Sequence, residues 1–252
     1  MSDVFSILLS SIHADMARAE RAAMNLANSQ TPGYKREVGP SMPFAARVGA
    51  GGASSAAATA SPQRPQTDLR PGTLKATGQA LDLAIVGEGW FEVSTPEGPA
   101  FTRQGNFRLD AEGRLVTQQG NPVMGTAGLI HLVHGSPRID EAGRVFERDW
   151  AEAGIASMAP AAVGQIKVVQ LEEAQALRRM GAGLVAHDGA AAVAGEGSAQ
   201  VRQGLLENSN VDPMREMVEL MQSVRHLETL QKVALGYDEM LGTSIRKLGE
   251  NG

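Results

Sequence analysis

The sequence predicts an α+β protein with a central antiparallel β domain, in which long N- and C-terminal helices pair as a coiled-coil-like layer. Two observations carry this prediction. Apolar residues recur at steps of three and four along both ends of the chain, which is the spacing of a heptad seam. Between the ends, short runs of alternating apolar residues are separated by glycine-containing turns, which favours antiparallel strands.

The N-terminal helix is predicted over residues 3–28, where apolar residues form one narrow stripe. Charged residues such as Asp15, Arg18 and Glu20 are expected to lie off this stripe. Alanine occupies its later positions, and small side chains let a second helix approach closely. The alternative is an amphipathic helix that packs on the core of its own domain.

A turn is predicted directly after this helix, at Thr31-Pro32-Gly33. Proline biases the residue before it away from the helical conformation, and glycine tolerates backbone angles that other residues avoid. We expect the turn to act as a hinge that sets the direction in which the chain leaves the helix. The residues predicted to form the hinge are Asn28, Thr31, Pro32, Gly33 and Tyr34.

The C-terminal helix is predicted over residues 212–248, because Asp212 is a good N-cap and Pro213 suits the first helical turn. Its apolar residues keep the heptad spacing. Two heptad stripes in one chain favour helix–helix assembly over packing on a globular core. The residues predicted to form the assembly interface are Phe5, Leu9, Ile12, Met16, Ala19, Ala23, Leu26, Met217, Leu220, Val224, Leu227, Ala234 and Leu241.

Between the helices the sequence predicts a flexible connector and a β domain. Alanine, glycine and serine dominate residues 45–66, a composition that cannot build a core. A repeat then marks two hairpins, because Arg108–Leu115 and Arg138–Val145 each place an acidic, glycine-ended turn between short strands. The predicted domains are 1–35 (N-terminal helix and turn), 36–66 (connector), 67–200 (β domain) and 201–252 (C-terminal helix).

Composition argues against several kinds of partner. The 252 residues carry a net charge of −5 and no long cluster of lysine or arginine, so neither nucleic acid nor an anionic membrane is expected to bind. The chain has no cysteine, which excludes disulfides and thiolate metal sites. No run approaches the length of a membrane span, and the short apolar run Phe5–Leu9 follows Asp3 rather than a basic segment, so a cleaved signal peptide is not expected.

The sequence does not predict an enzyme. His131 and His134 are three residues apart and would point to opposite faces of a strand, so no metal site is expected there. Acidic residues in the two hairpin turns are ordinary turn formers. We therefore expect no catalytic residue, cofactor, metal or small-molecule substrate. A peptidoglycan hydrolase is the enzymatic alternative, and it would need a placed acidic pair or a zinc triad.

Three segments resemble the flagellar rod and hook protein family, in the same order along the chain. The first is Asn25–Lys35, a helix end with asparagines followed by a Thr-Pro-Gly-aromatic turn. The second runs from Thr77 to Val123 and includes Phe101–Phe107, and the third is Gly204–Pro213 with the helix after it. The length and compact centre are most similar to proximal rod members, with distal rod members as the near alternative and the longer hook proteins further away.

The resemblance implies a structural subunit of the flagellar basal-body rod, whose partners are copies of itself and other rod subunits. Such proteins leave the cell unfolded through the flagellar type III export apparatus, with the N-terminal region uncleaved, and polymerise helically into a shaft that crosses the periplasm. The terminal helices would form the inner tube and the β domain the outer layer. An extracellular β-domain adhesin is the alternative from another class, although only two tryptophans and two tyrosines could serve a binding surface.

Overall fold

The structure is a computed structural model, and it describes residues 2–39, 66–133, 135–147, 162–171, 177–187, 189, 191–195 and 198–250. Most of the connector predicted for residues 36–66 therefore lies outside the described residues. The chain divides into two compact units. Met1–Ser29 and Val211–Gly252 form what we call the helical unit, and Gln30–Asn210 form the β unit.

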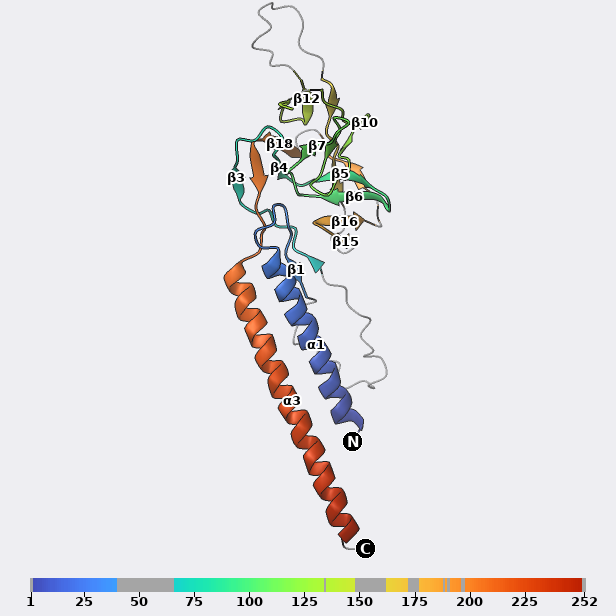
Figure 1. The fold of residues 1–252 in the computed structure, drawn as a ribbon, viewed down its shortest axis with the longest axis vertical. Helices are drawn as coiled ribbons and strands as arrows, with labels where there is room; N and C mark the ends of the chain where they lie inside the picture. Colours follow the sequence, from blue (N-terminus) through green and yellow to red (C-terminus); the bar gives the residue numbers. More distant parts are fainter. Residues whose placement is uncertain are drawn as a thin grey trace, which may run out of the picture. The chain divides into compact units, whose positions relative to one another are not determined.

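The helical unit consists of α1 (Ser2–Ala27) and α3 (Pro213–Glu250), which pack against each other in antiparallel directions (Figure 1). Both predicted helices are confirmed. The start of α3 is capped as expected, because Asp212 Oδ1 accepts hydrogen bonds from the backbone N–H groups of Met214 (3.0 Å) and Arg215 (3.3 Å). The end of α1 is capped by Asn28, whose Nδ2 donates to the carbonyl oxygen of Met24 at 2.9 Å.

The β unit is built from short strands. They are β1 (Glu37–Val38), β2 (Gln66–Thr67), β3 (Leu74–Ala76), β4 (Leu83–Gly87), β5 (Trp90–Thr95), β6 (Gly98–Thr102), β7 (Arg108–Leu109), β8 (Leu115–Val116), β9 (Met124–Gly125), β10 (Gly128–Leu129), β11 (Arg138–Ile139), β12 (Arg144–Phe146), β13 (Gly164–Gln165), β14 (Val168–Leu171), β15 (Leu177–Gly181), β16 (Leu184–His187), β17 (Ala191–Val193), β18 (Ala199–Gln203) and β19 (Leu205–Glu207).

Every pairing between these strands is antiparallel, which confirms the prediction of an antiparallel β domain. The largest sheet has the order β15-β16-β6-β5-β14-β17, and a three-stranded sheet has the order β11-β12-β13. Two further ladders join early strands to late ones, since β4 pairs with β18 and β3 pairs with β19. The last two strands of the β unit, β18 and β19, therefore pair with strands from the beginning of the same unit.

Buried apolar side chains of the β unit form two clusters, and the larger one contains residues from both early and late strands. Phe91 is fully buried and meets Phe107 edge to face, with ring centroids 5.1 Å apart. Leu83 of β4 and Val201 of β18 belong to the same cluster, so the late strands contribute to the core as well as to the ladders. Burial of such side chains is the main favourable term in the stability of the unit.

The repeated sequence folds as two matching hairpins, as predicted. In the first, Asp110 Oδ1 accepts from the backbone N–H of Arg114 at 2.7 Å, and Oδ2 accepts from its guanidinium at 2.6 Å. In the second, Asp140 makes the same pair of contacts with Arg144, at 2.9 and 2.7 Å. Both aspartates thus close β turns, which agrees with their interpretation as turn formers.

Candidate functional site

The seam between α1 and α3 is partly polar. Its most buried members on α1 are Asp15, Ala22 and Asn25, each exposed by 3% or less. On α3 they are Glu216 and Ser223, each 1% exposed. The residues follow one another at steps of seven or three along each helix, so they mark the line along which the two helices touch.

The predicted interface residues fall into two groups around this line. Half-buried positions beside the line are Ile12, Ala19, Leu26, Leu220, Leu227 and Ala234. Exposed positions are Leu9, Met16, Ala23, Met217 and Val224. The side chains of Phe5 and Leu241 lie outside the described residues. Each predicted heptad seam is thus split, with one half turned to the other helix of the pair and the other half turned to solvent.

One expectation about this seam is wrong, because Asp15 lies on it rather than off it. Its carboxylate is buried yet fully engaged: Oδ1 accepts from Arg18 Nη1 at 3.0 Å, and Oδ2 contacts Nδ1 of His226. A second polar pair crosses the seam where Asn25 Nδ2 donates to Glu216 Oε2 at 3.1 Å. Buried polar pairs of this kind fix the register of two helices, because any shift leaves buried groups unpaired.

Thr31–Tyr34 of the predicted hinge turn belong to the β unit and are packed against later segments of that unit. Gly33 has φ +67° and its N–H donates to the carbonyl oxygen of Glu207 at 2.7 Å. A Cβ at this position would lie 2.3 Å from the carbonyl carbon of Arg103. Tyr34 is buried, with the guanidinium of Arg179 4.5 Å from its ring centroid. The turn therefore needs glycine both for its conformation and for the close approach of two backbones.

Replacing Gly33 by alanine is expected to lower the free energy of unfolding of the β unit by about 2 kcal/mol or more, because positive φ and the backbone clash both penalise a Cβ. Urea denaturation of the full chain measures this loss. The matched control is Gly236→Ala in α3, where a Cβ meets nothing within 4 Å. That substitution should instead favour the helix by about 1 kcal/mol, and a loss of stability there would contradict the helical assignment.

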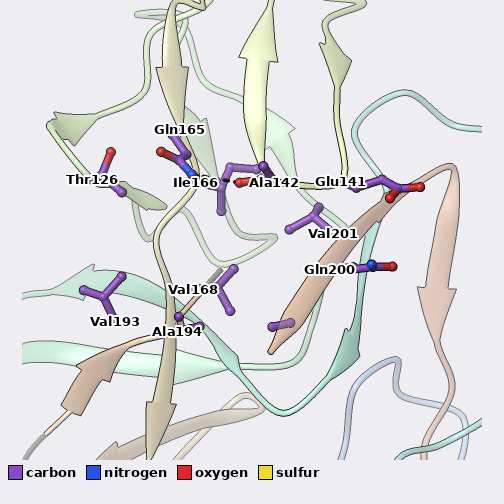
Figure 2. A pocket seen from close by; sticks show the side chains of 12 residues that line it. Thr126, Glu141, Ala142, Gln165, Ile166, Val168, Val193, Ala194, Gln200 and Val201 are labelled. Carbon is purple, nitrogen blue, oxygen red and sulfur yellow. Dashed lines mark hydrogen bonds between the residues drawn. The ribbon is translucent and has the colours of Figure 1, made fainter. Parts of the chain in front are cut away.

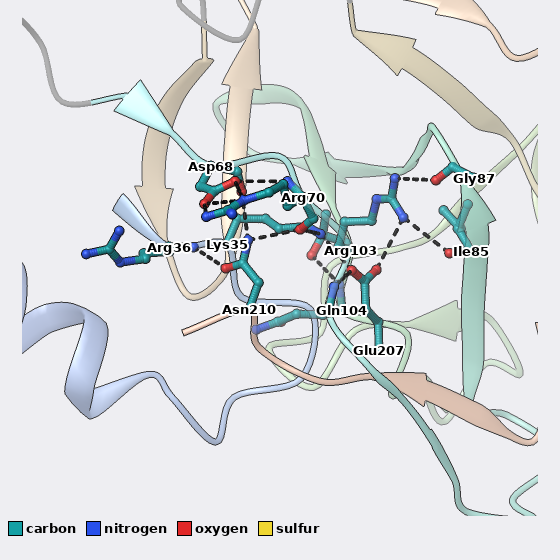
Figure 3. Close-up of polar contacts among 12 residues, drawn as sticks. Lys35, Arg36, Asp68, Arg70, Ile85, Gly87, Arg103, Gln104, Glu207 and Asn210 are labelled. Carbon is teal, nitrogen blue, oxygen red and sulfur yellow. Dashed lines mark hydrogen bonds and ion pairs between the residues drawn. The ribbon is translucent and has the colours of Figure 1, made fainter. Parts of the chain in front are cut away.

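A buried charge network lies beside the hinge turn (Figure 3). Glu207 Oε1 accepts from Lys35 Nζ at 2.6 Å and from the backbone N–H of Gly72 at 2.9 Å. Its other oxygen accepts from Arg103 Nη1 at 3.2 Å. The three charged side chains are almost fully buried, with exposures of 3% for Lys35, 6% for Arg103 and 1% for Glu207. We call Lys35, Arg103 and Glu207, together with the neighbouring Asn210, the Glu207 network.

Backbone carbonyl groups accept further hydrogen bonds from both cations, although Arg103 Nε is buried without a partner. Lys35 Nζ also donates to the carbonyl oxygen of Arg70 at 2.9 Å, and Arg103 donates to those of Ile85 (3.2 Å) and Gly87 (2.8 Å). Burial lowers the pKa of Lys35 below its ordinary value, and the Glu207 carboxylate opposes that shift. Burial lowers the pKa of Arg103 in the same way. The carboxylate of Glu207 therefore compensates two buried cations. Removing its charge should destabilise the β unit more than removing either cation.

Asn210 links the network to the backbone of two other segments of the chain. Its Oδ1 accepts from the backbone N–H of Arg36 at 2.6 Å, and its Nδ2 donates to the carbonyl oxygens of Asp68 and Arg70, both at 2.9 Å. Lys35, Arg103 and Glu207–Asn210 belong to the three segments of the sequence that resemble one family. The structure brings those segments together, and the network gives a physical reason for their residue types.

A separate pocket of about 300 Å³ lies between the second hairpin and strands β14 and β18 (Figure 2). Aliphatic side chains such as Ile166, Val168 and Val201 make up much of its wall. Glu141 is at its edge and is paired with Arg202 at 2.8 Å. The pocket therefore offers no cluster of titratable groups from the described residues that could carry out acid–base chemistry.

Metal binding and membrane insertion are the two remaining candidate roles for the described part of the chain. Within it, no group of three histidine, aspartate or glutamate side chains is placed to hold a metal ion. His131 lies in the β unit, whereas His134 is outside the described residues. None of the described helices combines the length and the apolar character that a membrane span requires.

The chain matches two family descriptions. Residues 84–155 match the flagellar hook protein FlgE/F/G D1 domain, and residues 202–247 match the C-terminal domain of the flagellar basal body rod FlgEFG proteins. The flagellar basal-body rod protein FlgF of Salmonella typhimurium is 32% identical over 234 residues, which is 90% of this chain and 90% of that protein. The chain belongs to the flagellar basal-body rod protein family.

Two further relatives are similar to this rod family chain. FlgF of Escherichia coli is 30% identical over 257 residues, with 90% of each chain covered. The rod protein FlgG of Bacillus subtilis is 30% identical over 238 residues, covering 86% of this chain and 88% of that protein. These similarities support a structural rod protein and do not support the adhesin alternative. The D1 match contains Arg103, and the C-terminal match contains Glu207 and most of α3.

Proposed function

We propose that this chain is a structural subunit of the flagellar basal-body rod that polymerises helically through α1 and α3 into the shaft crossing the periplasm. The observation that carries this proposal is the exposed half of each heptad seam, which includes Leu9 (45% exposed) and Met16 (55%) on α1 and Met217 (44%) on α3. Large apolar side chains at regular helical spacing cost free energy in water, so they favour a helical neighbour.

The mode of assembly follows from the same surfaces. In this proposal α1 and α3 belong to a coiled-coil-like inner layer, and the β unit to an outer one. A contact between different surfaces of neighbouring copies does not close on itself and generates a filament. The partners are copies of this chain and other rod subunits, and the subunit reaches the periplasm through the flagellar type III export apparatus without cleavage of its N-terminal region.

Ending the chain after Asn210 tests this proposal. The truncated chain keeps the whole β unit, including the Glu207 network, and lacks α3. We expect the truncated protein to fold but to give no rods in basal bodies examined by electron microscopy, and cells relying on it should not swim. Normal rods from this variant would contradict assembly through the helices, whereas the full-length chain expressed from the same vector is the control for expression.

A distal rod or hook subunit is the second candidate, because the chain is similar to FlgG as well as to FlgF. The two candidates differ in where the subunit lies along the axis. A tag on the β unit, located in purified basal bodies by electron microscopy, separates a proximal position from a distal one.

A further inference from the structure

The two outer flanks of the helix pair differ in character. On α1 the contact line runs through Asp15 and Ala22, and on α3 through Glu216 and Ser223. Each residue turns an α-helix by about 100°, so the residue after a contact position and the residue before it lie on opposite flanks. When two right-handed helices run antiparallel, the residue that follows a contact position lies on the same flank of the pair in both helices. The flanks can therefore be assigned from the sequence and the contact line.

The flank formed by residues that follow the contact line is apolar. It carries Met16 and Ala23 from α1 and Met217 and Val224 from α3, and Leu9 continues the same stripe. Its rim is acidic, since exposed Glu20 follows Met16 by one helical turn and exposed Glu228 follows Val224 by one helical turn. We call this surface the apolar face.

The flank formed by residues that precede the contact line is basic. It carries Arg21 from α1 and Arg215 from α3. A groove on this flank is lined by Arg18, Met214, Arg215, Val218, Glu219, Gln222, Ser223 and His226, which confirms that α1 and α3 share it. Its charged lining residues include Arg18, which is paired with Asp15 at 3.0 Å, Arg215 and Glu219, and exposed Val218 and Met214 line it as well. We call this surface the basic groove.

We propose that the apolar face of one copy docks into the basic groove of a second copy of this chain. The acidic rim at Glu20 and Glu228 complements the arginines of this flank, and the methionines of the apolar face meet the apolar side chains that line the groove. Methionine side chains adapt their shape, which suits a contact repeated along a curved helical array. This inference rests on the proposed function, since it names the two surfaces through which the helices of neighbouring subunits meet.

Cross-linking between two single-cysteine variants tests the pairing of faces, because the natural chain has no cysteine. Met16→Cys places a thiol on the apolar face, and Val218→Cys places one in the basic groove. With a short bismaleimide, a concentrated mixture of the two full-length variants should give at least tenfold more cross-linked dimer than either variant alone. Equal or greater yield from Met16→Cys alone, or no dimer in any sample, would overturn the proposal.

Charge reversal provides an independent arm in the full chain. Glu20→Lys with Glu228→Lys makes both surfaces basic, and Arg21→Glu with Arg215→Glu makes both rims acidic. Each double variant should lose at least tenfold in self-association, and a mixture of the two should regain it because opposite charges then meet. If the mixture fails to associate while the chain ending at Asn210 still forms no rods, the assignment of faces is wrong and assembly through the helices stands.

Discussion

Replacing Glu207 by glutamine will lower the free energy of unfolding of the β unit by about 3–5 kcal/mol, the range measured when a buried ion pair loses one partner. Glutamine keeps the shape and some of the hydrogen bonding but removes the charge. Lys35 and Arg103 would then lose the carboxylate that contacts them both, and only the more distant charges of Asp68 and Glu88 would remain to compensate them. Urea denaturation of the full chain, followed by the fluorescence of buried Trp90, measures the loss, because the guanidinium of Arg103 lies 5.7 Å from that ring.

The matched control is Lys35→Met, which removes one of the two cations and leaves Arg103 paired with Glu207. Methionine is similar in length to lysine and is apolar. The free energy of unfolding should therefore fall clearly less in this variant than in Glu207→Gln. Equal losses from the two variants would show that packing at this place matters and the charge balance does not.

Truncating Leu220 and Leu227 together to alanine is expected to abolish rod assembly while leaving the β unit folded. Both leucines are half-buried on the side of α3 that faces α1. Each truncation should cost about 2 kcal/mol, the low end of the range for buried leucine, because burial is incomplete. A two-helix unit has little stability to spare, so the pair of truncations should separate the helices. Soft-agar motility and the yield of basal bodies measure the outcome.

Arg225→Ala with Lys232→Ala is the matched control on the same helix. Both side chains are exposed, and alanine keeps the helix propensity high. Cells with this pair should swim normally, since exposed charges contribute about 0–1 kcal/mol. If cells with the leucine variant swim normally, or if cells with the charge variant do not swim, the assembly surface lies elsewhere.

The sequence predicts the architecture of this protein well because the relevant signals are local. Asp212-Pro213 determines where α3 begins, and the helical spacing of apolar residues identifies both helices. The acidic turns at Asp110 and Asp140 determine where two hairpins form. None of these predictions requires knowledge of which distant segments meet.

The phase of the helix contact could not be predicted, because apolar spacing defines a face that is broader than the line of contact. Asp15 and Glu216 lie on that line although hydropathy places charged residues outside it. The Glu207 network was missed for a related reason. Glu207 and Lys35 are 172 residues apart, and a single charged residue gives no sign in the sequence that its side chain is buried. The only signal in the sequence was that all three charges belong to the segments that resemble the rod family.

The hydrogen bond from Gly33 to Glu207 has a mechanical consequence for a rod subunit. The chain enters the β unit at Gln30 and leaves it at Asn210, so two covalent connections join the units. Just inside the β unit these connections are bonded to each other, by Gly33 to Glu207 at 2.7 Å and by Asn210 to Tyr34 at 3.3 Å. A force on either connection would therefore be shared with the other through these two hydrogen bonds. Pulling either segment out of the β unit would also require breaking the ion pairs of Glu207 with Lys35 and Arg103, so one buried cluster holds both ends of the β unit.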